Sequence, residues 1–372
     1  MKRKELLGEV ERIVIKVGTT SITKGSSTAS KEMMDSIAKQ VKELKDQGKE
    51  VLIVTSGAIG IGLKAIGVKP NPNNIPMRQA ASSVGQSILM QKWNESFQQQ
   101  GLLVAQILLT MDIYSDRDSV LNLNNTIDSL LEHNIVPIFN ENDAVSVKEI
   151  GAVFGDNDTL SAMIASRVDA DLLIILSDVD GLYNKNPSVH KDAKFISIVE
   201  EITPEIKEMA GDTVSGMGVG GMKTKIKAAE ICKDAGCRMV IVSSVIEDVI
   251  LKAAGGEDIG TIFVADTQMS KKKRWLKSAK SQGSIIVDEG AEKAIRNHQS
   301  LLPVGVIGVS GHFSNGDIVD IKREGIVIAR GTPNYNSNEV EKIKGLHSSR
   351  IQEALGKKKQ DDIIASENLV VF

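Results

Sequence analysis

The sequence has few of the features that mark a membrane protein or a disulfide framework. No run of about 18 or more apolar residues occurs, and the basic start MKRKELLGEVERIVIKVG lacks the uninterrupted apolar stretch of a secretory signal. Cys232 and Cys237 are the only cysteines, without C-x-x-C spacing or a neighbouring His, so we expect buried free thiols. These absences favour a cytoplasmic protein with no membrane partner.

Histidine, aromatic residues and net charge are sparse as well. The five histidines show no H-x-x-x-H pairing, which argues against a His-based metal site and a Ser-His-Asp hydrolase. The formal net charge is -3, so nothing in the composition demands a polyanionic partner. A length of 372 residues favours two domains over a single core.

Apolar runs that read as strands alternate with amphipathic stretches that read as helices. Because the runs are apolar on both faces, they indicate an α/β fold with a mostly parallel sheet sandwiched by helices. Ligands of such sheets bind beyond the carboxyl ends of the strands. The predicted strands are RIVIKVG at 12–18, EVLIVTSG at 50–57, LLVAQILLT at 102–110, IVPIFN at 135–140, DLLIILSD at 171–178 and RMVIVSS at 238–244.

The pattern changes after about residue 268. Residues 269–282 include the basic run KKKRW and the stretch SAKSQGS, which reads as a linker. Short strands punctuated by glycine follow in 283–361 and predict a small, mainly β, barrel-like module. The expected organisation is therefore an α/β domain over 1–268, a linker, this second domain and a tail over 362–372.

Polar residues gather where the predicted strands end. Lys16 ends the first strand and offers a cation to a moving phosphoryl group. Ser56 lies in VTSGAIGIG, a glycine-punctuated helix start that favours an anion. Asn157 and Asp158 lie in FGDNDTLSAMIA, which holds more carboxylate and amide groups than helix capping needs. Each cluster alone fits a strand-to-helix turn, but several at one end of the sheet indicate a site.

The stretch SGMGVGGMKTKIKAA at 215–229 resembles a P-loop but lacks its spacing, because Met222 separates Gly221 from the first lysine. Its glycines allow backbone N–H groups to approach phosphates, and Lys225 can reach them from the first helical turn. Lys223 and Lys227 are expected to point elsewhere, since residues two apart on a helix do not share a face.

Seven segments follow one another along the chain: IVIKVGTT, VLIVTSGAIGIG, RQAASSVGQ, NENDAV, FGDNDTLSA, LSDVDGLY and SGMGVGGMKTK. Taken together and in this order, they resemble the bacterial glutamate 5-kinases (γ-glutamyl kinases) of the amino acid kinase family. Residues 283–361 are similar to the PUA domain that many of these proteins carry. The resemblance covers nearly the whole chain.

The resemblance implies an ATP-dependent phosphotransferase that converts the γ-carboxylate of L-glutamate to L-glutamyl 5-phosphate, the first step of proline biosynthesis. It also implies Mg²⁺ carried mainly on ATP, with no metal ligands assigned on the chain. Feedback inhibition by proline, a homo-oligomer and functional coupling to glutamyl phosphate reductase belong to the same expectation. No general base is needed, because a carboxylate is already ionised at pH 7 and is itself the nucleophile.

Residue by residue, the resemblance implies that Lys16 and Lys225 neutralise the transferring phosphoryl group and that Asp158 orients both lysines. It assigns glutamate binding to Ser56, Asp143 and Asn157. Family members commonly have Thr where Ser177 stands, which keeps the hydroxyl group. The ATP-binding residues it implies are Lys16, Ser177, Asp178, Val219, Gly220, Gly221, Met222, Lys223, Thr224 and Lys225.

Two alternatives remain open at this point. A sister kinase of the same fold would phosphorylate another carboxylate, such as that of N-acetylglutamate. In the other alternative the protein binds RNA through the PUA-like module, next to the basic runs KKKRW and GKKK. The few aromatic residues of that module, Phe313 and Tyr335 among them, and the slightly acidic chain argue against RNA, which usually meets stacking side chains and a basic face.

Overall fold

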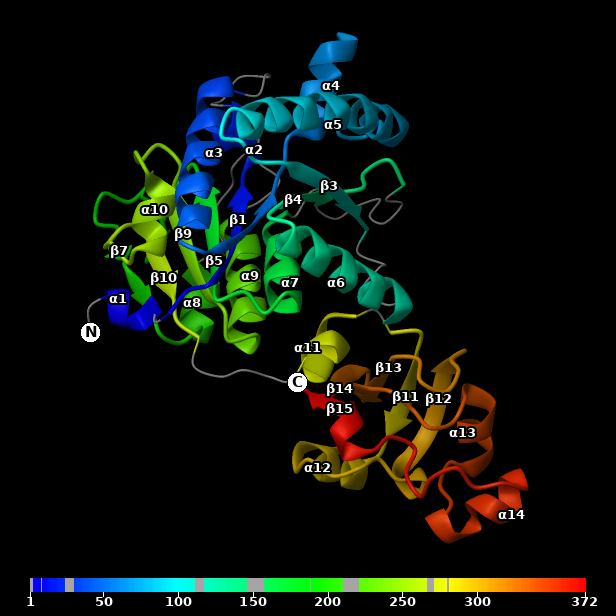
Figure 1. Cartoon of the computed structure of the whole chain (residues 1–372). Helices are drawn as coiled ribbons and strands as arrows, with labels where there is room; N and C mark the ends of the chain where they lie inside the picture. Colours follow the sequence, from blue (N-terminus) through cyan, green and yellow to red (C-terminus); the bar gives the residue numbers. More distant parts are fainter. Residues whose placement is uncertain are drawn as a thin grey trace. The chain divides into compact units, whose positions relative to one another are not determined.

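The computed structural model describes residues 3–7, 9–23, 30–110, 117–145, 157–187, 189–209, 221–265, 271–279 and 281–372. The chain divides into two compact units (Figure 1). The first comprises Met1–Thr110 and Leu121–Gln268, and the second comprises Met111–Val120 and Met269–Phe372.

The first unit is built on one sheet. Its strands are β1 (Arg12–Val17), β2 (Glu50–Val54), β3 (Val104–Leu109), β4 (Val136–Glu141), β5 (Leu172–Ser177), β8 (Ile198–Val199), β9 (Arg238–Ser243) and β10 (Thr261–Phe263). Their order is β3-β4-β2-β1-β5-β9-β10-β8, and β9 and β10 pair antiparallel while the other neighbours pair parallel. The mostly parallel sheet and all six predicted strand positions are confirmed. Strands β6 (Leu182–Tyr183) and β7 (Phe195–Ile196) form a separate pair.

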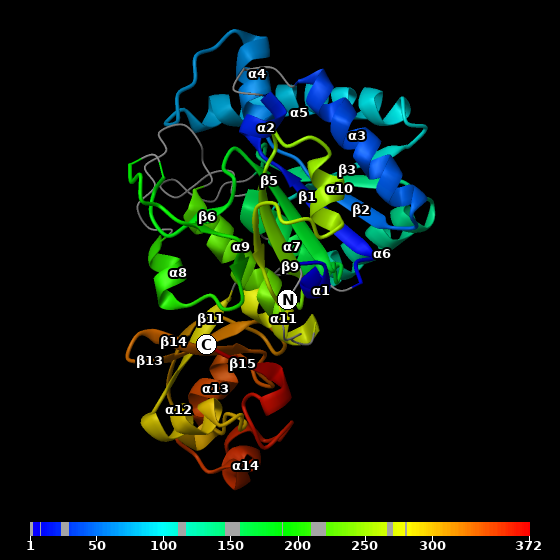
Figure 2. The same ribbon diagram turned by 90° about the vertical axis from the view of Figure 1, so that its left-hand side faces the viewer.

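Helices cover both faces of this sheet. The helices between Arg3 and Ala254 are α1 (Arg3–Leu7), α2 (Thr19–Thr23), α3 (Lys31–Asp46), α4 (Ala58–Ile66), α5 (Ile75–Gln98), α6 (Arg117–Glu132), α7 (Asn157–Arg167), α8 (Pro204–Met209), α9 (Met222–Asp234) and α10 (Val249–Ala254). α3, α5 and α10 pack over one face, and α7 packs against β1 and β5 from the other. Figure 2 shows β1, β2, β5 and β9 side by side among these helices. No described helix is long and apolar enough to span a bilayer.

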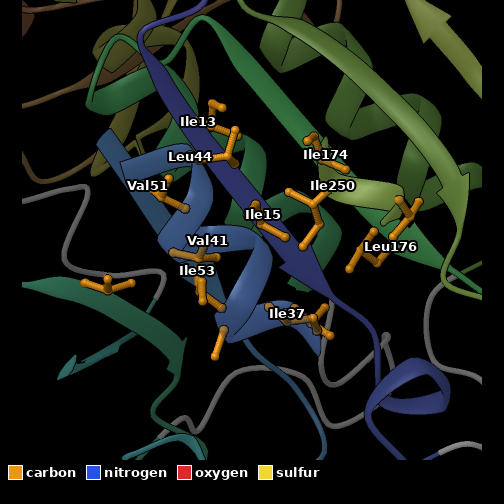
Figure 3. Close-up of a cluster of buried hydrophobic side chains, with 14 of the residues drawn as sticks. Ile13, Ile15, Ile37, Val41, Leu44, Val51, Ile53, Ile174, Leu176 and Ile250 are labelled. Carbon is orange, nitrogen blue, oxygen red and sulfur yellow. The ribbon is translucent and has the colours of Figure 1, made fainter. Parts of the chain in front are cut away.

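Alternation along the strands builds the core under α3. Ile13 and Ile15 point from β1 to the same side as Ile53, because residues two apart in a strand share a face. Ile37 and Val41, four apart on α3, meet them (Figure 3). The Ser30 side chain caps this helix by accepting from the Met33 N–H, so the helix begins at the position that aims its apolar stripe at the sheet.

α4 and α5 meet backbone to backbone at two glycines. A Cβ on Gly62 would lie 1.7 Å from the Ala81 carbonyl oxygen, and one on Gly85 would lie 1.8 Å from the Ala58 oxygen. No other residue fits at either position without separating the helices. The pair of glycines therefore fixes how closely α5 approaches the segment that follows β2.

The second unit holds a five-stranded sheet and its own core. The elements are α11 (Lys271–Ser278), β11 (Gly283–Val287), α12 (Glu289–Arg296), η2 (Pro303–Gly305), β12 (Val306–Gly311), β13 (Val319–Arg323), β14 (Ile326–Gly331), α13 (Ser337–Ile343), η3 (Ser348–Arg350), α14 (Ile351–Leu355), η4 (Ser366–Asn368) and β15 (Leu369–Val371). The strand order is β12-β11-β13-β14-β15, with β11 and β13 parallel. The separate β-rich domain that the sequence predicted is confirmed.

Two segments differ from the expected linker and tail. Residues 271–278 form α11, whose Leu276 is buried against Ile318 and Val370, so this stretch is a packed helix of the second unit. The expected tail supplies β15, which pairs antiparallel with β14 and buries Leu369. Both departures have one cause, because apolar side chains in polar surroundings find a face of the sheet to cover.

Candidate active site

Two lysines from different elements converge on one carboxylate. Lys16 is the penultimate residue of β1 and Asp158 is the second residue of α7, and the Lys16 Nζ lies 2.6 Å from the Asp158 Oδ1. Lys225, in the first turn of α9, places its Nζ 3.1 Å from the Asp158 Oδ2. All three side chains are buried. Like charges resist such proximity unless an anion lies between them, so Asp158 fixes where both ammonium groups end.

The charge state of Asp158 follows from these neighbours. Burial alone would raise its pKa, but the ammonium groups of Lys16 and Lys225 and a hydrogen bond from the Thr224 hydroxyl lower it. The net result is a pKa well below the ordinary value, so the carboxylate is ionised at neutral pH. This permanently charged carboxylate holds both lysine side chains in place.

The residues around Lys225 take different directions. The Thr224 Oγ1 lies 2.9 Å from the Asp158 Oδ2 and 2.8 Å from the Gly221 carbonyl oxygen, so Thr224 supports the carboxylate. Met222 is half-buried, whereas Lys223 and Lys227 are exposed. Val219 and Gly220 lie outside the described residues. This part of the glycine stretch thus brings Lys225, and not Lys223, to Asp158.

Asn157 lies next to Asp158 in sequence, but its side chain forms hydrogen bonds with residues in or directly after other strands. Its Nδ2 lies 2.8 Å from the Thr55 carbonyl oxygen, 2.9 Å from the Ser56 Oγ and 3.1 Å from the Asn140 Oδ1. Ser56 follows β2 and Asn140 belongs to β4. The sheet order β4-β2-β1-β5 therefore sets amide and hydroxyl groups on one side of Lys16.

Ser177 and Asp178 lie on the other side of Lys16, at the end of β5. The Ser177 Oγ is 3.2 Å from the Asp178 Oδ1, and Ser177 is buried while Asp178 is exposed. β5 pairs with β1 in parallel, with Lys16 opposite Ile175. The predicted ATP side and the predicted substrate side are thus separated by the strand that carries Lys16.

Asp143, the third predicted substrate residue, is held by a helix. The Ser82 Oγ donates to its Oδ2 at 2.9 Å, and both residues are buried. Burial raises the pKa of Asp143, while the Ser82 hydrogen bond and the positive charge of Arg78 lower it in part. A buried carboxylate of raised pKa is poised to meet a cation.

Our residue-level prediction missed what α5 contributes. Ser82 and Gln86 are four apart on this helix, both are buried, and they contact Asp143 and Asn140 respectively. A signal was present, because SSVGQ at 82–86 combines two polar residues at i and i+4 with a glycine between them, which fits a close-packed polar face. Without the fold, the same spacing describes a solvated face.

Helix starts complete the electrostatics of this edge of the sheet. Gly57, at the start of α4, has φ 97°, and Gly221 opens α9, so neither N-cap has a side chain to satisfy the first N–H groups. Gly57 needs to be glycine for this left-handed conformation, whereas a Cβ on Gly60 would meet open space. Uncapped starts of this kind favour anionic groups.

Comparison with known proteins identifies the family of the chain. Residues 11–243 match the amino acid kinase family, and residues 283–355 match the PUA domain. The chain belongs to the amino acid kinase family. It is 52% identical over 378 residues to the glutamate 5-kinase of Methanosarcina barkeri, covering 100% of this chain and 99% of that protein.

Similar proteins come from more than one domain of life. The glutamate 5-kinase of Caldanaerobacter subterraneus subsp. tengcongensis is 44% identical over 365 residues, covering 97% of this chain and 98% of that protein. The resemblance to glutamate 5-kinases is therefore confirmed, but it is not confined to bacterial members. A solved isopentenyl phosphate kinase of T. acidophilum aligns with a TM-score of 0.47 at 18% identity, over 68% of this chain and 99% of that one.

Proposed function

We propose that this protein transfers the γ-phosphoryl group of ATP to the γ-carboxylate of L-glutamate, giving ADP and L-glutamyl 5-phosphate for proline biosynthesis. An oxygen of the carboxylate attacks the γ-phosphorus, and the bond from that phosphorus to the β,γ-bridging oxygen breaks. One observation carries the proposal. Asn157 contacts the Ser56 hydroxyl and the Asn140 amide, whereas the adjacent Asp158 contacts a pair of buried lysines.

Lys16 and Lys225 are the proposed catalytic residues. Their ammonium groups offset the negative charge of the equatorial oxygens as the phosphoryl group moves. Asp158 is a positioning residue in this scheme, because it holds both ammonium groups on its two oxygens. The substrate carboxylate supplies the nucleophile, so the chain needs no general base.

Ser56, Asp143 and Asn157 are proposed to bind glutamate. The α-ammonium group finds a buried anion in Asp143, and the hydroxyl of Ser56 lies beside the Asn157 amide. Acetylating the amino group would remove its charge and leave the Asp143 carboxylate unpaired, which costs binding energy. The proposed subsite therefore selects glutamate over N-acetylglutamate.

ATP is proposed to lie over the end of β5 and the start of α9. The suggested contacts are Lys16, Ser177, Asp178, Val219, Gly220, Gly221, Met222, Lys223, Thr224 and Lys225. Asp158 is already engaged by two lysines and Thr224, so this cluster offers cations rather than a vacant carboxylate. That fits Mg²⁺ bound through the phosphates of ATP, where it neutralises their charge.

We also propose that the protein is a cytoplasmic homo-oligomer and that proline inhibits it by feedback. The proposed domains are a kinase domain over 1–268 and a PUA-like domain over 283–361. Glutamyl 5-phosphate is a reactive mixed anhydride, which favours prompt consumption by glutamyl phosphate reductase. Proline shares the α-carboxylate and the cationic amino group of glutamate, which supports competition near Asp143.

Trapping the product tests the function. With hydroxylamine present, the protein should convert L-glutamate and MgATP to the γ-hydroxamate, with ATP consumption that depends on glutamate. N-acetylglutamate and aspartate should be poor substrates. Faster hydroxamate formation from either of them would assign the chain to a sister kinase, and no glutamate-dependent turnover would refute the proposed function.

A further inference from the structure

Gln86 is buried on the proposed substrate side of the site. Its Oε1 accepts a hydrogen bond of 2.8 Å from the Asn140 Nδ2, and the side chain is 7% exposed. It reaches this position because Gly85 lets α5 approach α4 closely. Ser82, one turn earlier on the same face, holds Asp143.

The orientations of three carboxamides follow from two backbone groups. The Thr55 carbonyl can only accept, so the Asn157 Nδ2 faces it at 2.8 Å. The Glu141 N–H can only donate, so the Asn140 Oδ1 faces it at 2.9 Å. The Asn140 Nδ2 must then donate to Gln86, which receives it on Oε1.

This chain of hydrogen bonds leaves two buried atoms without partners. They are the Gln86 Nε2, a donor, and the Asn157 Oδ1, an acceptor, and neither has a hydrogen-bond partner within the part of the chain that the structure describes. An unpaired buried polar group is costly, so a folded protein keeps one where a bound molecule supplies the partner. Here the two atoms offer one donor and one acceptor.

We infer that Gln86 is a substrate-binding and specificity-determining residue, whose Nε2 donates to the α-carboxylate of the bound amino acid. The Asn157 Oδ1 accepts from the same substrate. This inference rests on the proposed function and names the group that recognises the end of glutamate that does not react.

The sheet order assigns the α-carboxylate, and not the γ-carboxylate, to Gln86. Gln86 contacts β4, which is two strands from β1 and its Lys16. At a strand spacing of about 4.8 Å, that offset is roughly 10 Å. The reacting γ-carboxylate must lie beside the lysines, so the group that reaches Gln86 is at the opposite end of the substrate.

Replacing Gln86 with Glu isolates the proposed donor. The Gln86→Glu side chain keeps its shape and an oxygen for the Asn140 Nδ2, but an acceptor replaces the Nε2 donor. The Michaelis constant for glutamate should rise about 10-fold or more, while that for ATP stays unchanged. Gln98→Glu is the matched control, because Gln98 is exposed on the same helix, and it should behave as wild type.

Two further readouts separate binding from packing. The ratio of variant to wild-type KM for glutamate should fall as the pH is lowered, because a protonated Glu side chain can donate again. The α-amide of glutamate should be a poor substrate for wild type. Gln86→Glu should narrow the preference for glutamate over this amide, since the amide N–H can donate to the new carboxylate.

The outcomes distinguish the inference from the function. Suppose that the wild-type protein turns over glutamate, and that Gln86→Glu changes neither the KM for glutamate nor the preference for glutamate over its α-amide. This result would overturn the inference, because the Gln86 Nε2 would then donate to nothing more than a buried water. Equal rises of both Michaelis constants with a lower melting temperature would also overturn it, because they indicate packing. Absence of glutamate turnover in the wild-type protein would instead refute the proposed function.

Discussion

Each unit contains a buried carboxylate that forms ion pairs, with one basic side chain in the second unit and two in the first. In the second unit the Arg330 Nε donates to the Asp320 Oδ1 at 2.7 Å, and the Ser281 Oγ donates to the Oδ2 at 2.7 Å. Arg330 also donates to the carbonyl oxygens of Lys277 and Ala279, at the end of α11. One cation, one anion and local backbone groups thus fasten a helix to a sheet.

In the first unit, two cations from β1 and α9 share the single carboxylate of Asp158, at the edge of the sheet where substrates are expected. On the proposed substrate side of this edge, Gln86 and Asn157 each keep a buried atom without a hydrogen-bond partner among the described residues. An ion pair whose hydrogen bonds are satisfied by nearby protein groups stabilises the structure. Two cations on one carboxylate, together with polar atoms without partners, indicate a binding site for a ligand.

The second unit has a cavity of about 560 Å³, which contains none of the predicted site residues. Its lining mixes the basic Lys322 and Arg323 with the acidic Asp288, Glu289 and Glu324. RNA phosphates need a face of one sign, so this surface does not favour the RNA-binding alternative.

Removing a converging cation should have the largest effect. Lys225→Ala and, separately, Lys16→Ala should lower kcat by roughly 100-fold or more, the scale for losing one preorganised donor at the transition state. Lys227→Ala is the matched control, because its side chain is exposed on the helix of Lys225 and has no proposed role in the site, and its kcat should stay near wild type. Normal turnover of the Lys225→Ala protein would mean that the ion pairs of Asp158, like that of Asp320, only stabilise the structure.

The second-largest effect should come from separating α4 from α5. The Cβ of Gly85→Ala would overlap the Ala58 carbonyl oxygen, so the free energy of unfolding should fall by about 3 kcal/mol. The KM for glutamate should rise with it, because Ser82 and Gln86 move away from their partners. Gly60→Ala is the control, since its Cβ meets open space, and denaturant unfolding should show no loss of stability.

Breaking the ion pair between Arg330 and Asp320 should lower stability without changing turnover. Arg330→Met leaves Asp320 without its cation and removes the bonds to α11, so the second unit should lose about 2 kcal/mol of unfolding free energy. Turnover measured below the melting temperature should remain that of wild type. A large loss of turnover in a folded Arg330→Met protein would assign this pair to the reaction.

Acidification should weaken glutamate binding through Asp143. Its raised pKa means that the carboxylate takes up its proton at a higher pH than the ordinary value of about 3.9, and the anion that meets the α-ammonium group is then lost. The KM for glutamate should therefore rise several-fold as the pH falls toward that range. Asp158 stays ionised there because its pKa is lowered.

Asp143→Asn supplies the reference for this measurement, because the γ-carboxylate of free glutamate also titrates, near pH 4.3. The variant should bind glutamate weakly at every pH and show only the substrate's own titration. A wild-type profile parallel to that of the variant would mean that Asp143 does not meet the ammonium group.

Most of the first unit's sheet was predictable from local patterns. Runs such as RIVIKVG are apolar on both faces, and this pattern depends only on neighbours within one strand. The packing of residues 271–278 could not be predicted in this way. Trp275 and Leu276 interrupt a basic run, and whether they pack depends on a sheet formed by residues far along the chain.

Local patterns were enough to predict the strands, the second β-rich domain and the polar clusters at the carboxyl ends of the strands, because these features follow from the period and composition of short segments. Which clusters meet depends on the fold. It directs the consecutive residues Asn157 and Asp158 to different strands, and it brings Ser82 to Asp143 across 61 positions of sequence. Such contacts depend on strand order and on the close approach of α4 and α5, neither of which is encoded in the spacing of any one segment.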